Sequence, residues 1–293
     1  MNSSKTFHSL IVGTQLQQRL LIIVVVLSGL LAACGPSTAP STPTPVAISQ
    51  TTLTVSGSGS ISGVLSDIEA PFEADTAGYN LNVLSGNGTS GGVQGVLEGI
   101  LDVAAMSREP RDEEVAQGLQ YVGFGKTGTA IIVHPDVQVS NLTQEQLRGI
   151  FMGEITNWAE VGGQDLAIVL FVRDADEPTT IILREKVFGD AAFPETVAGI
   201  LTATTTMVSS VETIQGSIGF GNWAGILAAR QTVKTVTIDN LMPDVTDYPY
   251  QLALGVGYVE DRREAVQPLL EWLLSEKGQT VLRSLGVINL PKQ

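Results

Sequence analysis

The 293-residue chain has few of the residues that disulfides and metal sites require. Cys34 is its one cysteine, so no disulfide can form within a single chain. Beyond the first 33 residues His134 is the one histidine, and a histidine without cysteine partners cannot build a zinc site. The composition therefore gives poor support to metal-dependent hydrolysis, and we expect no cofactor.

Basic residues are also scarce, with 16 Lys and Arg against 30 Asp and Glu. Loss of the first 33 residues would remove Lys5 and Arg19 and no acidic residue, which makes the remainder still more acidic. Such a surface disfavours nucleic acid and anionic lipid as partners. It does not exclude a buried anion site, because such a site depends on local N–H donors and one or two arginines.

The apolar run at residues 20–30 is too short to span a bilayer comfortably and fits the hydrophobic region of a signal peptide. It ends in Leu31-Ala32-Ala33-Cys34-Gly35, which resembles a bacterial lipobox. The resemblance implies cleavage before Cys34 and lipidation of its sulfur, with palmitate among the acyl groups. An uncleaved anchor helix is the alternative, and either would hold the protein outside the cytoplasm. Residues 34–50 are rich in Pro, Ser and Thr and predict an extended tether of about 3 Å per residue.

Residues 81–108 are the stretch around which we expect the rest to be organised. A short apolar strand runs into Gly86-Asn87-Gly88-Thr89-Ser90-Gly91-Gly92, and helical spacing begins at Val93. A helix start offers unpaired N–H groups and a positive dipole, and Thr89 and Ser90 add hydroxyls. A second strand, residues 101–105, leads to Ser107 and Arg108. We interpret the arrangement as half of an oxyanion pocket.

Two other interpretations of this loop stay open at this point. It fits G-x-G-x-x-G, the dinucleotide fingerprint. However, Asp102 comes too early to be the acidic residue expected about 20 positions later, and an exported protein meets little free NAD. Alternatively, the glycines serve packing in a tight turn.

Other segments predict an α/β protein. Residues 52–55 form a strand, a loop with Ser58 and Ser60 follows, and an amphipathic helix ends near Pro71. Residues 121–125 and 129–133 predict two strands around a glycine-rich passage. Trp158 is expected in an exposed loop, with a structural anchor as the alternative.

Residues 142–163, LTQEQLRGIFMGEITNWAEVGG, resemble the matching stretch of PstS-type phosphate-binding proteins, the receptors of phosphate ABC importers. The glycine-rich loop and Ser107-Arg108 precede this stretch and residues 215–220 follow it, which is the order of these parts in the family. The resemblance therefore covers residues 51–290. It implies an α/β, two-lobed periplasmic-binding-protein-like (type II) fold with two crossing strands. Lobe I would comprise 51–125 and 222–293, and lobe II 126–221. We expect a monomer that meets an ABC permease.

One loop departs from this family, which typically has Arg followed a few residues later by Ser-Gly-Thr. Here Glu177, Pro178 and Thr179 stand in that stretch, so a hydroxyl, an N–H and a glycine are lost and a negative charge is gained. A second departure is Ser107-Arg108, where several members place a carboxylate.

The candidate ligand-binding residues are eight donors and one acceptor carboxylate. Asp176 is the candidate acceptor, with Asp102 second, because a carboxylate accepts a proton that phosphate carries and sulfate lacks. The donors are Ser58, Ser60, Thr89, Ser90, Ser107, Arg108, Arg173 and Thr180. We expect a receptor that captures inorganic phosphate and performs no chemistry. The alternatives are a receptor or sensor for another oxyanion and an extracellular phosphoester hydrolase.

Overall fold

The computed structural model describes residues 50–290 of the chain. The predicted signal peptide, Cys34 and nearly all of the tether lie outside these residues, so the predictions about them stay predictions. Among residues 50–290, no helix combines the length and apolarity needed to cross a membrane.

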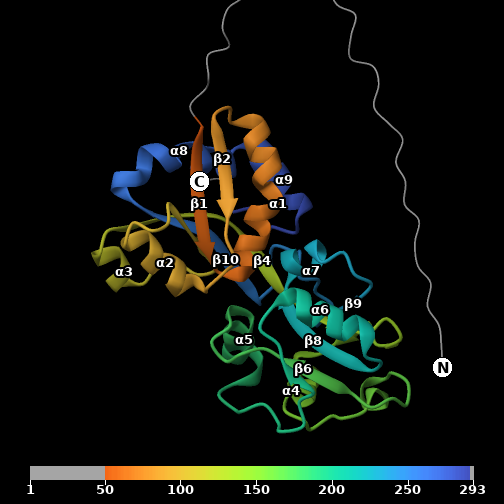
Figure 1. Ribbon diagram of the computed structural model, residues 1–293. Coiled ribbons are helices and arrows are strands. Elements are labelled where there is room, and N and C mark those ends of the chain that lie inside the picture. Colours follow the sequence, from red (N-terminus) through yellow and green to blue (C-terminus); the bar gives the residue numbers. More distant parts are fainter. Residues whose placement is uncertain (1–49, 291–293) are drawn as a thin grey trace, which may run out of the picture. The chain divides into compact units, whose positions relative to one another are not determined.

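The first lobe is built on three parallel strands and one antiparallel strand. In the sheet, β1 lies between β2 and β3, and β10 pairs with β3 in the antiparallel direction. Figure 1 shows β1 beside β2 in this lobe. The strands are β1 (Thr51–Gly57), β2 (Tyr79–Val83), β3 (Val103–Met106) and β10 (Gln251–Val259). The helices are α1 (Gly59–Asp75), α2 (Thr89–Leu97), α3 (Asp112–Ala116), η3 (Glu260–Arg262), α8 (Arg263–Leu274) and α9 (Glu276–Ser284).

Helix α1 supplies much of the first core. Ile61, Leu65, Ile68 and Phe72 are fully buried along its inner face. The sequence predicts an end near Pro71, and this is wrong, because the helix continues to Asp75 with Pro71 inside it. Proline removes one backbone hydrogen bond and costs helix stability, but burial of Phe72 beyond it stabilises the last turn.

Strand β4 (Leu119–Val133) belongs to both lobes. Residues 119–128 pair with β10, and residues 129–133 pair with β8 (Ser217–Asn222). The sequence predicts two strands here, but Gly123, Gly125 and Gly128 do not interrupt the strand. A Cβ on Gly128 would lie 2.2 Å from the carbonyl oxygen of Pro243, so close backbone packing accounts for this glycine.

The second lobe joins parallel and antiparallel strands to the end of β4. Strand β6 is parallel to β7 and β8, and β9 pairs with β4 and β5. The strands are β5 (Asn141–Leu142), β6 (Val169–Val172), β7 (Gly199–Ile200) and β9 (Lys234–Ile238). The helices are α4 (Gln144–Phe151), η1 (Trp158–Val161), α5 (Pro178–Leu183), η2 (Arg184–Phe188), α6 (Thr204–Thr213) and α7 (Trp223–Ala228).

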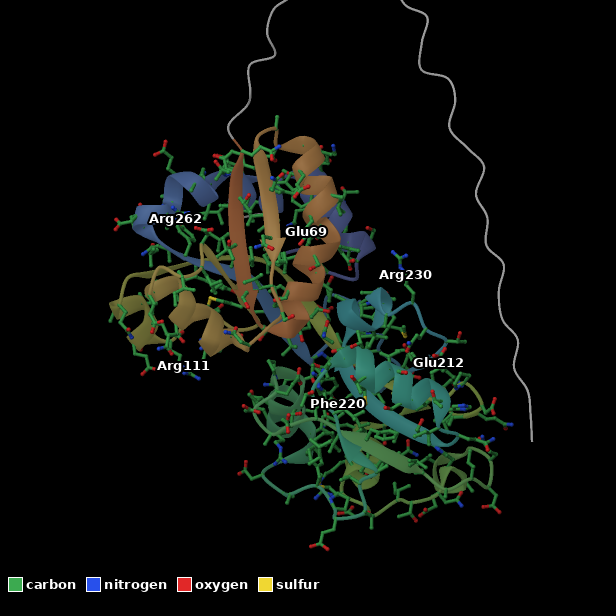
Figure 2. All side chains as sticks on the ribbon, viewed as in Figure 1. Glu69, Arg111, Glu212, Phe220, Arg230 and Arg262 are labelled. Carbon is green, nitrogen blue, oxygen red and sulfur yellow. The ribbon has the colours of Figure 1, made fainter. Side chains whose placement is uncertain are left out.

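Aromatic side chains fill the second core. Phe151 stacks on Phe188 with ring centroids 4.9 Å apart, and Phe220 meets Phe151 edge-on at 5.4 Å. Figure 2 shows Phe220 inside this lobe, whereas Glu212 lies at its surface. Trp158, expected in an exposed loop, is fully buried and donates its indole N–H to the carbonyl of Gly216 at 2.9 Å. The exposed position is wrong and the alternative, a structural anchor, is confirmed, because a large apolar ring gains most stability when it is buried.

The strands divide the chain somewhat differently from the predicted lobe boundaries. Strand β9 and residues Tyr248 and Tyr250 follow position 222, yet they pack in the second core. Helix α7 contributes Ala224 to the first core and Ile226 to a core of the second lobe. The chain therefore returns to the first lobe with β10.

Candidate anion site

Strand directions place the predicted loops at two edges that share β4. The carboxyl ends of the parallel strands β1, β2 and β3 lie at one edge of the first lobe. Met106 is level with Gly255, which in turn pairs with Gly123 of β4. Asn222, at the carboxyl end of β8, pairs with Thr129 of β4. Both sets of loops are therefore directed toward residues 123–129 of β4, as ligand-binding loops of open α/β sheets are.

Close backbone contacts join the first-lobe loops. The N–H of Ser58 donates to the carbonyl of Ala105 at 2.8 Å, and the N–H of Gly88 donates to that of Gly57 at 2.9 Å. A Cβ on Gly86 would lie 2.6 Å from the Cα of Gly59, and one on Gly92 would lie 2.7 Å from the Cα of Gly57. These glycines therefore serve packing between loops, which brings the starts of α1 and α2 together.

Helices α1 and α2 begin without a side-chain cap. Their N-cap residues are Ser58 and Gly88, and neither makes a side-chain cap hydrogen bond. By contrast, Thr143, Asn222 and Ser275 cap α4, α7 and α9 with side-chain oxygens. No N-cap side chain therefore accepts from the first turns of α1 and α2, although the N–H of Ile61 donates to the carbonyl of Ser58 at 3.0 Å. The N–H groups at such helix starts bind anions.

Hydroxyl groups surround these helix starts. The hydroxyls of Thr89 and Ser107 lie 3.1 Å apart, and the N–H of Ser107 donates to Thr89 Oγ1 at 3.3 Å. Ser58 and Ser107 are buried, whereas Ser60 and Thr89 are half-buried. The structure thus brings four of the predicted donors to one edge of the first lobe.

Arg108 is engaged within its own lobe. Its two terminal nitrogens donate to the carboxylate of Glu114 at 2.7 and 2.8 Å, and the N–H of Arg111 donates to the same group at 2.7 Å. The hydrogen bonds from Arg108 hold the pKa of Glu114 below its ordinary value, against burial, which raises it. Arg108 therefore fixes α3, and an anion could use only its remaining N–H groups. Glu114 is not among the residues predicted from the sequence, although Arg111-x-x-Glu114 has capping-box spacing.

Arg173 begins the loop after β6 and is 4% exposed. Its guanidinium donates to the hydroxyl of Thr204 at 2.9 Å and to the carbonyl of Thr202 at 2.7 Å. Its Nε–H has no partner among the described residues. Burial lowers the pKa of Arg173, and the charges of Glu177 and Asp174 partly oppose this. Asn222 also donates to Thr204, at 3.2 Å, so the carboxyl ends of β6 and β8 are linked.

Glu177 lies beside Arg173 and caps α5. Its carboxylate is 3.3 Å from a terminal nitrogen of Arg173. It also accepts from the N–H of Thr179 at 2.7 Å, from the N–H of Thr180 at 3.3 Å and from the hydroxyl of Thr179. The carboxylate thus uses one charged donor, two amides and a hydroxyl.

The other candidate residues differ in their surroundings. Thr180 is fully buried in α5, and its hydroxyl has no partner within the described part of the chain. Asp176 is exposed in the turn before α5. Ser90 is exposed on α2 and lines an open groove of about 420 Å³ with residues of α3. Asp102 lies at the start of β3, where it accepts from the N–H of Thr54 at 2.8 Å and pairs with Arg262, away from the carboxyl edge.

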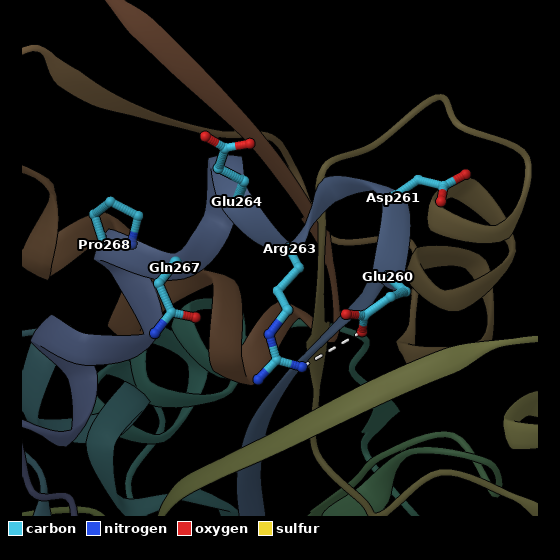
Figure 3. A pocket seen from close by; sticks show the side chains of 6 residues that line it. All are labelled: Glu260, Asp261, Arg263, Glu264, Gln267 and Pro268. Carbon is cyan, nitrogen blue, oxygen red and sulfur yellow. Dashed lines mark hydrogen bonds and ion pairs between the residues drawn. The ribbon is translucent and has the colours of Figure 1, made fainter.

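A larger open groove of about 570 Å³ lies at the start of α8 (Figure 3). Its lining includes Glu260, Asp261 and Glu264, and Arg263 there is 3.4 Å from Glu260. Three carboxylates and one paired arginine repel an anion, and none of the predicted site residues lines this groove. Within residues 50–290, no cluster of three His, Cys, Asp or Glu could hold a metal ion.

The model of the PBP superfamily domain matches residues 42–277, most of the chain. The chain belongs to the PBP superfamily. The predicted α/β, periplasmic-binding-protein-like fold is thereby confirmed, and the relatives and structures that follow confirm the resemblance to PstS-type proteins.

Named relatives of this PBP-superfamily chain include two proteins called phosphate-binding protein PstS. That of Borreliella burgdorferi is 28% identical over 221 residues, which are 69% of this chain and 77% of the relative. That of Bacillus subtilis is 27% identical over 241 residues, which are 78% of this chain and 76% of the relative.

Solved structures agree with the fold. One is a candidate phosphate ABC transporter substrate-binding protein from Clostridium perfringens with bound phosphate, with a TM-score of 0.73 and 25% identity. It matches 82% of this chain and all of that one. An ABC-type phosphate transport receptor from Vibrio cholerae has a TM-score of 0.61 and 24% identity, with the same coverage.

Proposed function

We propose that the protein is an extracytoplasmic receptor that captures inorganic phosphate between its two lobes and delivers it to an ABC permease. The observation that carries the proposal is the meeting of two uncapped helix starts, α1 and α2, beside the hydroxyls of Thr89 and Ser107. Amide and hydroxyl donors at such a point match the oxygens of a tetrahedral anion. The names of the relatives support phosphate as that anion.

The second lobe would supply the charged donor. Arg173 is buried at the carboxyl edge of β6 and keeps an unpartnered Nε–H, and Thr180 keeps an unpartnered hydroxyl. Buried donors without acceptors are costly, so a ligand oxygen that pairs with them stabilises the closed state. Asp176 remains the candidate acceptor for the proton of phosphate. Because it is exposed, this role requires that closure bring it against the ligand.

Calorimetric titration with phosphate, sulfate, molybdate and a phosphomonoester tests the proposal. We expect binding of phosphate and little heat from sulfate. Tighter binding of molybdate or sulfate would favour a receptor for another oxyanion, and turnover of the ester would favour a hydrolase. Absence of binding by all four would refute the receptor function.

The anchor is a separate part of the proposal. Cys34 would carry the lipid, and residues 34–50 would hold the folded part away from the membrane. In cells that express the full chain, the parent should begin at Cys34 and carry an acyl mass, and the Cys34→Ser variant should carry none. A parent that keeps residues 1–33 and carries no acyl mass would instead support the anchor helix.

A further inference from the structure

Glu177 occupies the position in the second lobe that the proposed ligand would need. Its two carboxylate oxygens contact the guanidinium of Arg173, the amides of Thr179 and Thr180, and the hydroxyl of Thr179. Charged, amide and hydroxyl donors of this kind are those that bind a phosphate oxygen. The side chain is 11% exposed, and that of Arg173 is 4% exposed, so the ion pair is largely shielded from water.

Two further donors at this place lack an acceptor. The Nε–H of Arg173 and the hydroxyl of Thr180 are both buried and unpartnered within residues 50–290. A loop whose only task was to cap α5 would gain nothing by burying them, since an unsatisfied buried polar group costs about 1–3 kcal/mol. They point to a ligand oxygen that adds to, or replaces, the internal carboxylate.

The charges of the loop oppose a second anion. Asp174, Asp176 and Glu177 lie within four residues of Arg173, so the segment has three negative charges and one positive charge. Asp174 and Asp176 are exposed and therefore screened by solvent, whereas Glu177 is not. Its charge would act most strongly on an anion bound at Arg173.

We propose that Glu177 is an internal competing anion, whose carboxylate must leave Arg173 and the start of α5 before phosphate can bind there. This inference rests on the proposed function and adds that the native side chain weakens binding. The bound state must recover the contacts that Glu177 gives up. The apparent affinity is therefore the intrinsic affinity multiplied by the fraction of molecules in which Glu177 is displaced.

Two variants of Glu177 test the inference by phosphate calorimetry at fixed pH and ionic strength. Glu177→Gln removes the charge and keeps the size of the side chain. Glu177→Ser removes the charge and the bulk, and serine is a good N-cap, so α5 keeps a capping oxygen. We expect both to bind phosphate at least about tenfold more tightly than the parent, which corresponds to about 1.4 kcal/mol.

Glu185→Gln is the matched control, because it makes the same charge change in η2, where Glu185 is 61% exposed and pairs with Lys186. We expect its phosphate affinity to stay within about twofold of the parent, since exposed charges are screened. A gain of equal size in Glu185→Gln would assign the effect to net charge and overturn the inference.

The results separate the inference from the receptor function. If the parent binds phosphate and both Glu177 variants bind equally or more weakly, the inference is overturned and the receptor function stands. If the parent does not bind but the variants do, the inference is upheld and phosphate capture by the native chain is refuted. If no form binds, both are overturned. Thermal melts of each variant show whether it is folded before titration.

Discussion

Arg173 links two loops of the second lobe before any ligand is bound. Its nitrogens reach Thr204, the carbonyl of Thr202 and Glu177, which belong to different segments of the chain. Two hydrogen bonds from different nitrogens, together with the ion pair to Glu177, require a planar guanidinium, and an ammonium group cannot reproduce them. The residue therefore has a structural role in addition to the binding role that we propose.

We expect Arg173→Lys to lower the free energy of unfolding by about 1–3 kcal/mol, because at least one buried acceptor loses its donor. Urea unfolding measures the change. Arg148→Lys is the control, since Arg148 is 45% exposed and pairs with the exposed Glu154. Its effect should stay within about 0.5 kcal/mol. Equal losses of unfolding free energy in the two variants would show that the contacts of Arg173 contribute no more to stability than those of an exposed arginine.

Alanine in place of Gly92 and alanine in place of Gly63 should change the stability of the protein in opposite directions. A Cβ on Gly92 meets the backbone of Gly57 at 2.7 Å, whereas one on Gly63 meets nothing within 4 Å. We expect Gly92→Ala to destabilise by about 1–3 kcal/mol through overpacking. Gly63→Ala should stabilise by about 0.5–1 kcal/mol, because alanine is the better helix former inside α1. Thermal unfolding measured by circular dichroism tests both, and a stable Gly92→Ala would mean that the loops can separate without cost.

The sequence indicates which residues of the site matter, but it does not indicate which groups they contact. The resemblance to the family indicates Arg173, which keeps its place in the loop, and the extra charge of Glu177, which departs from it. It does not indicate that they pair, since the choice of rotamer depends on Thr202 and Thr204, about 30 residues later. The glycines of residues 86–92 predict close approach, but the sequence cannot tell an anion from the backbone of Gly57.

At the scale of elements, helix α3 depends on one carboxylate. Glu114 accepts from Arg108 and from the N–H of Arg111, and its side chain is 8% exposed. Its pKa is lowered chiefly by the hydrogen bonds from Arg108, so the folded state favours the charged form. Stability from this group is therefore present above the ordinary pKa of glutamate and is lost as the pH falls through the lowered pKa.

We expect Glu114→Gln to lose about 1–3 kcal/mol of unfolding free energy at pH 7, where the parent carboxylate is charged. The difference between the two proteins should shrink as the pH falls below about 4, because the parent then loses the same charge. Urea unfolding across this range measures it, with the exposed Glu113 changed to Gln as the control. A difference that did not vary with pH would exclude the ion pair as its cause.

Elements are predicted well where periodicity and loops agree, as for α1, β2 and α2. The predicted ends of these elements are less accurate, because tertiary packing decides where each helix or strand stops. Burial of Phe72 extends α1 past Pro71. Strand β4 continues across three glycines because β10 pairs with residues 119–128, and β8 and β9 pair with the residues that follow. No local pattern contains those partners.

For the whole molecule, ligand binding should appear as added stability. At a phosphate concentration 100 times the dissociation constant, we expect about 2.7 kcal/mol of stabilisation, and hence a higher melting temperature. Sulfate at equal concentration and ionic strength should give a much smaller shift. Differential scanning fluorimetry measures both. Equal shifts from the two anions would indicate a general salt effect and contradict selective capture.

The arrangement of the lobes follows from the resemblance, and no single residue pattern contains it. Periodicity predicts the strands, but it cannot assign β9 to the second lobe, because that assignment depends on pairing with β4 a hundred residues earlier. Similarly, Glu177 is a visible departure in the sequence, whereas its position against Arg173 depends on the folded loop.

The passage of β4 through both lobes has a consequence for dissecting the protein. Residues 119–128 complete the sheet of one lobe and residues 129–133 that of the other, with no linker between them. Fragments made by cutting the gene at this point would each expose an unpaired strand edge and tend to aggregate. We therefore expect the two lobes to fold together, and neither fragment to form a stable domain on its own.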